Sequence, residues 1–268
     1  MWTTVPNATK QVTDYQFRRL SVDLGQEQIH EEVVPCRDLD DFLGGMGRAF
    51  RLLADYDVDD AFSPAAPLVM NLGVFSGTDL MTGLRVFFSA YSPLKVANNG
   101  RPLVMWSTAS GKFATKVLAT DIDEVVFIGR AARPVFLLMQ KIDDGLSLSL
   151  EDAGPLLGLE THDKALNLTD RYPDSHVAVL GPAGEQGQDN YYAAIACSTV
   201  NQLHSRESKP RFAGRGGMGS IMGSKNLIAI VAQAPDVHRG RLSPALLAAN
   251  KEISRGPGSV NYRDVKKG

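Results

Sequence analysis

The sequence predicts an α+β domain made of two β-rich halves with flanking helices. Three observations support this class. The chain has 268 residues, of which 44% are hydrophobic, enough to bury at least one full core. Short apolar runs rich in β-branched and aromatic residues alternate with Gly, Pro and Asn turns. Two series of such runs repeat one layout, which indicates an internal duplication.

The N-terminal part predicts a strand and then a helix. Residues 16–24 alternate between apolar and polar as an opening strand does, and the acidic stretch after them is expected at the surface. Apolar residues at three- and four-residue spacing predict a helix over 38–53 with one buried face. Gly44, Gly45 and Gly47 interrupt this helix at a cost of roughly 1 kcal/mol each relative to Ala. They therefore indicate a close approach to the backbone.

The middle of the chain predicts a mixed sheet region in two series of strands. The first series is expected at residues 68–72, 85–90, 103–106, 125–128 and 135–139, and the second at residues 176–180, 191–197 and 227–231.

Glycine turns divide both series at similar spacing. Gly73 and Gly111 are 38 residues apart, and Gly181 and Gly217 are 36 residues apart. We therefore expect residues 67–130 and 175–235 to share one topology and to face each other across a common cleft, where the glycine turns meet.

The last part of the chain differs in composition. Residues 1–235 are predicted to form one domain, and residues 236–268 a basic C-terminal tail with one short helix that begins at Ser243 and Pro244. The tail is expected to be a solvated, partly ordered terminus, with docking onto a partner chain as the alternative.

Composition excludes several classes of protein. The 28 Lys and Arg against 30 Asp and Glu give a net charge of -2, so no nucleic-acid partner is expected. The longest apolar runs are too short to span a membrane, and Met1 to Lys10 contains no signal-peptide pattern. A soluble, cytoplasmic protein is expected. The two cysteines form no CxxC pair and the five histidines lack ligand spacing, so no residue is predicted to bind a metal directly.

The glycine-rich segment 213–227 is the most informative motif. It has five glycines in ten residues, with Arg215 and Lys225 as cations and Ser220 and Ser224 as hydroxyl donors. Such a segment lets backbone N–H groups approach an anion, so it predicts contact with a phosphate or another anionic cofactor group. A glycine turn that only joins two elements is the alternative. A dinucleotide site is rejected because residues 209–211, directly before the motif, are Lys-Pro-Arg and not an apolar strand.

Two further residues have both a functional and a structural interpretation. Glu185 ends a tight turn and could accept hydrogen bonds from loop amides, or the turn could be purely structural. Arg85 begins an apolar strand, where its guanidinium could bind a phosphate or carboxylate in the cleft, or could be a solvated charge at a strand end. Cys197, within an apolar run, is interpreted as a core residue.

Taken together, these motifs resemble the N-terminal, cofactor-binding domain of the tungsten-dependent aldehyde:ferredoxin oxidoreductases. The resemblance extends over about residues 16–235, and its most specific segment is GRGGMGSIMGSKNL at 214–227. The other matching segments are 17–24, 43–53, 62–64, 76–78, Arg85, 92–94 and 181–185.

The resemblance implies a fold and a cofactor. The fold is two mixed β-sheets related by a pseudo-twofold, in agreement with the duplication above. Between the sheets lies a tungsten (or molybdenum) ion held by two pterin dithiolates, whose phosphates are joined by a magnesium ion. The residues expected to bind this cofactor are Arg85, Thr108, Ser110, Gly111, Ala213, Gly214, Arg215, Gly216, Gly217, Gly219, Ser224 and Lys225. Acid–base candidates in the matched loops are Glu185, Lys225 and Lys112.

The sequence also departs from the family pattern. Residues 108–111 read Thr-Ala-Ser-Gly where the family usually has Asn-Ser-Gly-Gly, Met46 replaces an arginine, Gln186 replaces an Asn and Ile228 replaces a Lys. The two later domains of the family, which carry four cysteines for an iron–sulfur cluster, have no counterpart in this sequence. Two isolated cysteines cannot hold such a cluster. We therefore expect no iron–sulfur cluster in this chain.

Three functions follow as hypotheses. The first is a pterin-binding subunit or domain of a tungsten or molybdenum aldehyde oxidoreductase, with a second protein that provides the cluster. The second is a free-standing, cofactor-free enzyme that uses the same cleft for a small-molecule substrate, and the third is a non-catalytic pterin carrier. In the family this domain is covered by two other domains, so on its own it is expected to expose apolar surface. We therefore predict a homodimer or a complex with a second protein, with the helix at 38–53 and the tail from Arg239 as the contact regions.

Overall fold

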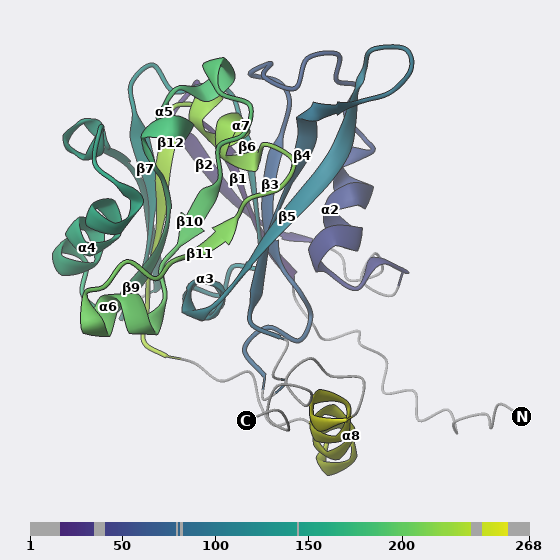
Figure 1. The fold of residues 1–268 in the computed structure, drawn as a ribbon, viewed down its shortest axis with the longest axis vertical. Helices are drawn as coiled ribbons and strands as arrows, with labels where there is room; N and C mark the ends of the chain where they lie inside the picture. The colour runs from purple at the N-terminus through teal and green to yellow at the C-terminus, as the bar shows by residue number, and fades with distance from the viewer. Residues whose placement is uncertain are drawn as a thin grey trace, which may run out of the picture.

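The fold consists of two six-stranded mixed β-sheets packed face to face (Figure 1). The structure is a computed structural model that describes residues 17–34, 41–78, 80, 83–143, 145–236 and 243–256. The first sheet contains β1 (Phe17–Asp23), β2 (Gln28–Val34), β3 (Leu68–Leu72), β4 (Arg85–Val96), β5 (Pro102–Ser110) and β6 (Glu124–Ile128). The second sheet contains β7 (Val135–Ile142), β8 (Gly145–Asp152), β9 (Ser175–Leu180), β10 (Ile195–Cys197), β11 (Arg211–Ala213) and β12 (Leu227–Gln233).

The two sheets have the same topology. Their strand orders are β2-β1-β6-β3-β4-β5 and β8-β7-β12-β9-β10-β11, so each strand of the second sheet occupies the place of the strand six earlier. In both sheets the first strand pairs antiparallel with the second and parallel with the last. The predicted α+β class and internal duplication are confirmed. The repeat is longer than predicted, because it begins at β1 and β7 and includes a hairpin in each half.

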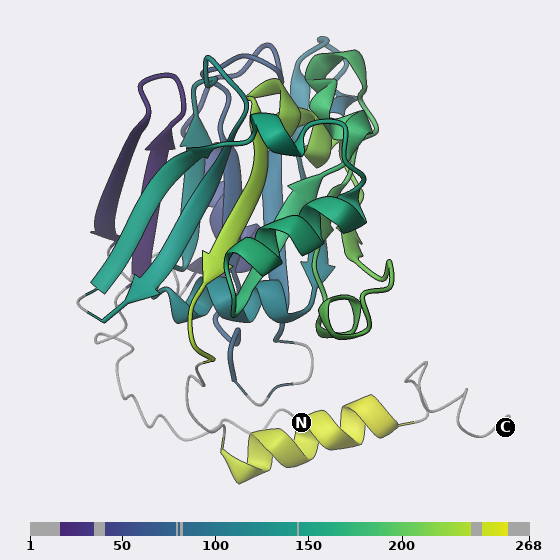
Figure 2. The same ribbon diagram turned by 90° about the vertical axis from the view of Figure 1, so that its left-hand side faces the viewer.

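Helices lie between the sheets and on both outer faces (Figures 1 and 2). They are α2 (Gly45–Leu53), α3 (Lys112–Ala119), α4 (Thr161–Arg171), α5 (Pro182–Glu185), α6 (Val200–Ser205), α7 (Met218–Ser224) and α8 (Pro244–Arg255), with short 3-10 turns at Gly154–Leu156 and Gly187–Asp189. The described part of the chain contains no helix long and apolar enough to cross a membrane.

The main core lies between the sheets and includes the apolar faces of α3 and α7. These two helices occupy equivalent places, directly before β6 and β12. Smaller clusters pack α4 on the outer face of the second sheet and α2 on the outer face of the first. Because both faces of the central strands are covered, β3 and β9 are buried along their whole length. This explains why their sequences are mostly apolar and do not alternate with exposed polar residues.

Several predicted elements need correction. The acidic stretch after β1 lies at the surface as expected, but it forms the edge strand β2, which was not predicted and in which Glu31 and Glu32 pair with Arg18 and Arg19 of β1. Cross-strand ion pairs thus replace the apolar alternation that marks a strand. Residues 135–139 lie in β7 of the second sheet rather than in the first, and β8 and α4 had no predicted counterpart.

The expected helix over 38–53 is interrupted. Leu43 and Gly44 have φ of 53° and 73°, and α2 begins only at Gly45. Gly44 instead pairs with Gly73 at the end of β3 through an isolated β-bridge. The close approach to the backbone that the glycines predicted is therefore made by a strand of the same chain. Residues 38–40 lie outside the described residues.

The C-terminal helix begins where the sequence predicts. The Ser243 hydroxyl caps α8 by accepting a hydrogen bond from the Leu246 amide at 3.2 Å, and Pro244 occupies the first turn. None of the α8 residues is buried, and Figure 2 shows the helix apart from the two sheets. The rest of the predicted tail lies mostly outside the described residues.

Candidate functional site

The edge strands β5 and β11 bring the two halves together (Figure 1). Two hydrogen bonds join the glycine-rich loop of the second half to the first half. The Arg215 amide donates to Ser107 Oγ at 3.0 Å, and the Ser92 hydroxyl donates to the Gly216 carbonyl at 2.8 Å. The start of the glycine-rich loop is therefore held along the seam between the sheets.

Two adjoining clefts open along this seam and share Arg85 as a wall residue. The larger has a volume of about 830 Å³ and the smaller about 510 Å³. The larger is lined by Leu84, Arg85, Ser110, Gly111, Lys112, Thr199, Val200, Asn201, Lys209, Pro210 and Arg211. The smaller is lined by Arg85, Trp106, Ser107, Thr108, Phe212, Gly214 and Arg215.

The lining of both clefts is cationic. It contains three arginines and two lysines but no Asp or Glu. Lys112 pairs with Asp236 at 2.8 Å and Lys209 pairs with Glu207. These ion pairs involve carboxylates that do not line the clefts. The seam is therefore suited to bind an anion.

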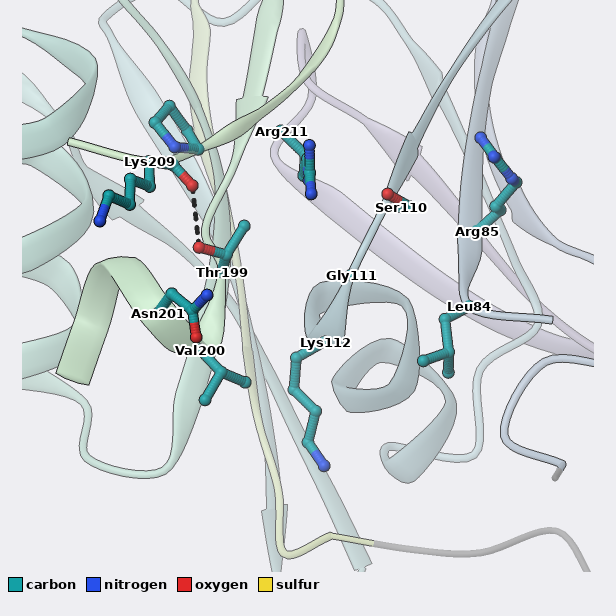
Figure 3. A pocket seen from close by; sticks show the side chains of 11 residues that line it. Leu84, Arg85, Ser110, Gly111, Lys112, Thr199, Val200, Asn201, Lys209 and Arg211 are labelled. Atoms are coloured by element: carbon teal, nitrogen blue, oxygen red, sulfur yellow. Dashed lines mark hydrogen bonds between the residues drawn. The ribbon is translucent and has the colours of Figure 1, made fainter. Parts of the chain in front are cut away.

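The arginines of the seam have no carboxylate partner among the described residues. Arg85, Arg211 and Arg215 are all exposed and form no ion pair within the described ranges. In Figure 3, Arg211 lies across the larger cleft from Ser110, while Lys209, Thr199 and Asn201 form one wall. Guanidinium groups left free in this way can bind phosphate or carboxylate through two parallel N–H donors.

At two glycines, the main chain that borders the clefts is not covered by a side chain. At Gly111, which precedes α3 with φ of 132°, an added Cβ would be 3.8 Å from its nearest neighbour, the Ser198 carbonyl. At Gly214 the nearest atom would be the Ala194 Cβ at 3.7 Å. Because no side chain covers the main chain at either position, a ligand can approach it closely.

The structure brings together about half of the predicted site. The predicted residues that line the clefts are Arg85, Thr108, Ser110, Gly111, Lys112, Gly214 and Arg215. Thr108 donates its hydroxyl hydrogen to the Val86 carbonyl at 2.8 Å, so only its oxygen lone pairs are left for a ligand. Ala213 is buried in β11 and does not line either cleft.

The later glycines of the loop contact protein atoms instead. A Cβ at Gly217 would lie 2.7 Å from the Tyr191 carbonyl, and one at Gly219 would lie 2.6 Å from the Ala193 carbonyl. A Cβ at Gly216 would also meet a protein side chain, at 3.0 Å. These glycines allow α7 to pack closely against the chain before it, which is the structural alternative considered for the motif.

Lys225 and Ser224 lie inside the protein at the end of the same segment. Lys225 is 1% exposed, and its ammonium donates to the carbonyls of Pro64 at 3.2 Å and Gly129 at 3.3 Å, both in the first half. Burial lowers the pKa of Lys225 to about 8. Ser224 donates to the Ile221 carbonyl of its own helix at 2.8 Å. Neither side chain lines a cleft, so the location of Lys225 indicates a role in joining the two halves.

Glu185 is held in a buried ion pair. Lys164, which is 0% exposed, donates to Glu185 and also to the Leu180 carbonyl at 2.7 Å. The Gly158 amide donates to the same carboxylate at 3.0 Å. These contacts join α4, β9 and α5 within the second half. Among the three acid–base candidates, only Lys112 lines a cleft.

The sequence reasoning missed Lys209 and Arg211. Their segment was used only as an argument against a dinucleotide site, yet both side chains line the larger cleft. Two cations on either side of a proline, directly before a glycine-rich loop, were the available signal. Their position opposite Ser110 and Lys112 depends on the packing of the two sheets, which the sequence does not show.

The described residues contain no group of three His, Cys, Asp or Glu side chains that could hold a metal ion. Cys197 is buried in β10, and burial raises the pKa of its thiol, which disfavours the reactive thiolate.

The fold and the seam define a class of protein: a duplicated two-sheet α+β domain with a cationic cleft that can bind an anionic ligand. The chain belongs to the aldehyde ferredoxin oxidoreductase N-terminal domain family, whose model matches residues 19–234. The resemblance seen in the sequence is thereby confirmed.

Individual relatives support the family assignment. The chain is 31% identical over 224 residues to the tungsten-containing aldehyde ferredoxin oxidoreductase of Pyrococcus abyssi, covering 82% of this chain and 33% of the relative. It is 24% identical over 238 residues to the aliphatic sulfonate oxidoreductase WOR-like subunit of Pyrococcus furiosus, covering 82% of this chain and 34% of the relative. The chain spans about a third of the length of these relatives.

A solved structure shares the fold. The active site complex BamBC of benzoyl coenzyme A reductase, in complex with 1,5-dienoyl-CoA, contains a chain that matches with a TM-score of 0.71 and 26% identity. The match covers 84% of this chain and 32% of that chain.

Proposed function

We propose that this chain binds the pterin cofactor of a tungsten- or molybdenum-dependent oxidoreductase and works with a second protein that provides the iron–sulfur cluster. The observation that carries the proposal is the cationic seam between β5 and β11, in which the free guanidinium groups of Arg85 and Arg215 lie beside uncovered backbone at Gly214. The similarity to tungsten-containing relatives supports tungsten as the metal.

The residues present fit the phosphates of such a cofactor. Arg85 and Arg215 would each bind a phosphate through paired N–H donors, and the Ser107–Arg215 hydrogen bond would keep the second arginine in place. A magnesium ion would take its oxygens largely from the phosphates, in agreement with the lack of an acidic cluster among the described residues. The metal held by the pterin dithiolates would supply the redox chemistry.

A protein partner is also part of the proposal. Two of the similar proteins are named as a subunit or as a complex of subunits. Lys112 is the acid–base candidate that we retain, because it lines the larger cleft and is held there by Asp236. The carboxylate of Asp236 accepts from both Lys112 and Lys116, which lowers the pKa of Asp236 and keeps it ionised.

Metal and phosphorus analysis of the protein purified from its native host tests the proposal. Stoichiometric tungsten or molybdenum together with phosphorus supports an oxidoreductase subunit. Pterin without turnover would indicate a carrier, and the absence of both metal and pterin would favour a free-standing enzyme that acts on a small molecule.

A binding experiment tests the seam itself. Inorganic pyrophosphate should bind the purified chain, and Arg215→Gln should weaken that binding at least tenfold by calorimetry, because the variant loses a charge-assisted pair of hydrogen bonds. Arg130→Gln is the matched control, since Arg130 is exposed but lines neither cleft. Equal affinity in wild type and Arg215→Gln would contradict a phosphate site at this arginine.

A further inference from the structure

Among the described strands, β2 and β8 form the two sheet edges that lie away from the seam (Figure 2). The other two edge strands, β5 and β11, lie side by side. β8 has the place in the second sheet that β2 has in the first, so the two edges can be compared directly. An edge strand exposes unpaired N–H and C=O groups, and proteins prevent it from pairing with another strand by means of charged side chains, proline or bulges.

The edge at β2 has this protection, whereas the edge at β8 does not. The sequence of β2 is QIHEEVV, and its two glutamates pair with two arginines of the neighbouring β1. The sequence of β8 is GLSLSLED, with no charge and no proline from Gly145 to Leu150. Its pairing with β7 is regular along its whole length. The second sheet therefore offers a regular, uncharged edge to another strand.

The free backbone groups of this edge belong to Leu146, Leu148 and Leu150. The Ala153 amide donates to the Pro134 carbonyl at 3.0 Å, which extends the antiparallel ladder of β7 and β8 by one residue. Backbone groups point to opposite sides at successive residues of a strand, so every second residue before Ala153 directs its N–H and C=O to β7. The three leucines between them direct theirs away from the sheet, while their side chains are partly buried against the core.

The sequence of β8 is suited to pair with itself. Leucine and serine alternate over residues 146–150, and this pattern is the same in both directions. In an antiparallel pair of two copies centred on Ser149, Glu151 lies opposite Ser147 of the other copy, and no carboxylate of β8 lies opposite another. Twofold dimers are the commonest homo-oligomers. The net charge of -2 gives little repulsion between copies.

We propose that β8 pairs with β8 of a second copy of this chain, so that the second sheets of two copies become one continuous sheet across a twofold axis at Ser149. This ladder joins one strand of each copy, whereas a stable interface buries about 1,600 Å² in total. The exposed helix α8 would add contact area. The seam lies at the opposite edge of the sheet and stays open to its ligand and to a second protein.

Charges at Ser149 test the pairing through the mass of the full chain. In sedimentation equilibrium at micromolar concentration, wild type should be a dimer. Ser149→Lys and Ser149→Glu should each raise the dimer Kd at least tenfold, because two like charges then lie opposite each other at the axis. An equimolar mixture of the two variants should dimerise again, because Lys then lies opposite Glu. A monomeric wild type, charged variants that dimerise as wild type does, or a mixture that stays monomeric would overturn the proposal.

Two control variants separate strand pairing from other effects of the substitution. The Ser149 hydroxyl donates to Glu151 Oε1 at 2.7 Å, and Ser149→Ala removes this hydrogen bond without adding a charge. His30→Lys adds a charge to β2, where His30 is exposed and lies opposite Ser21. Both controls should dimerise with a Kd within twofold of wild type. A control that weakens the dimer as strongly as Ser149→Lys would overturn the proposal.

Amide hydrogen exchange of wild type identifies the strand that pairs and needs no variant to fold. In the dimer, the Leu148 amide should exchange at least tenfold more slowly than in a sample diluted until it is monomeric, because its N–H donates across the axis. The Ser147 amide, which faces β7, should be protected in both samples. A dimer in which the Leu148 amide exchanges as fast as in the monomer would overturn the proposal.

Discussion

At the scale of single residues, two titratable side chains, Lys225 and His176, are buried in the domain. The ammonium of Lys225 follows α7 in the second half and donates to two carbonyls of the first. His176 on β9 lies against Ser198, with Nδ1 2.9 Å from the hydroxyl oxygen. Neither side chain lines a cleft, so both are expected to affect stability rather than binding.

Lys225 should make stability rise with pH in the alkaline range. Its pKa is about 8 in the folded chain against 10.5 when unfolded, so the unfolded chain binds more protons between these values. The free energy of unfolding of wild type relative to Lys225→Met should therefore increase by about 1 to 3 kcal/mol from pH 8 towards pH 10.5. Urea unfolding across this range measures the difference. A parallel pH dependence for wild type and Lys225→Met would contradict the expectation, and Lys251→Met in the exposed α8 is the control.

His176 should make stability fall in acid. Its pKa is lowered from 6.5 to about 4, mainly by burial; Lys116 and Lys112 act in the same direction, and Ser198 and Asp236 act in the opposite direction. Between pH 6.5 and pH 4 the unfolded chain gains a proton that the folded chain does not bind. Wild type should therefore lose about 2 to 3 kcal/mol relative to His176→Gln over this interval. Thermal melts of both proteins at pH 7, 5.5 and 4.5 give the comparison, and identical shifts would show that His176 is not responsible.

At the scale of elements, the glycine-rich loop has two parts with different tasks. Gly214 lies at the open cleft, whereas Gly217 begins α7 with φ of 74° in contact with the chain around Tyr191. One motif therefore combines a glycine at an open cleft with glycines that close packing requires. The interrupted helix before α2 also shows close packing at a glycine, because Gly44 pairs with Gly73 and an added Cβ at Gly44 would lie 3.0 Å from the Leu72 carbonyl.

Alanine at these two glycines should separate the tasks. Gly217→Ala should lower stability by about 1 to 3 kcal/mol, because the residue has a positive φ and its Cβ would lie 2.7 Å from a carbonyl oxygen. Gly214→Ala should leave the melting temperature almost unchanged, because its Cβ makes an ordinary contact at 3.7 Å, and should weaken pyrophosphate binding instead. Calorimetry and thermal melting of both variants measure the two effects. If Gly217→Ala lost pyrophosphate binding without losing stability, the result would indicate that this glycine belongs to the ligand site.

At the scale of the whole molecule, the duplicated core is complete without the C-terminal segment. α8 has no buried residue, and Asp236, the last described residue before it, is anchored to α3 through Lys112 and Lys116. The helix begins with a well-formed cap although it adds nothing to the core. Its amphipathic sequence is available for association with another chain.

Association should depend on this helix. The full chain is expected to form a homodimer or a complex with a second protein, and a chain that ends at residue 237 should be monomeric. Its melting temperature should stay within about 2 °C of the full chain, since no core contact is removed. Light scattering at micromolar concentration measures the mass of both forms. A full chain that is monomeric and purifies from its host without a partner would contradict the prediction and favour a self-contained enzyme.

The sequence by itself determined the repeating plan of this protein. Mostly apolar runs at residues 68–72 and 176–180 were predicted to be strands, and the spacing of the glycine turns was enough to indicate two equivalent halves. Among the residues that the sequence singled out, Arg85, Gly111 and Arg215 line the clefts. The local pattern of apolar residues did not predict the strand β2, because ion pairs with β1 take the place of apolar alternation there.

Only the tertiary structure decided which of the predicted residues meet. Lys225 and Glu185 have the chemistry of acid–base groups, yet one joins the halves and the other pairs with Lys164 inside the second half. Lys209 and Arg211 reach the cleft because the edge strands β5 and β11 lie side by side. The physical reason is that the side of a strand or loop that faces the cleft depends on contacts between residues far apart in the sequence. Residue type and spacing indicate the local structure, but they do not determine those long-range contacts.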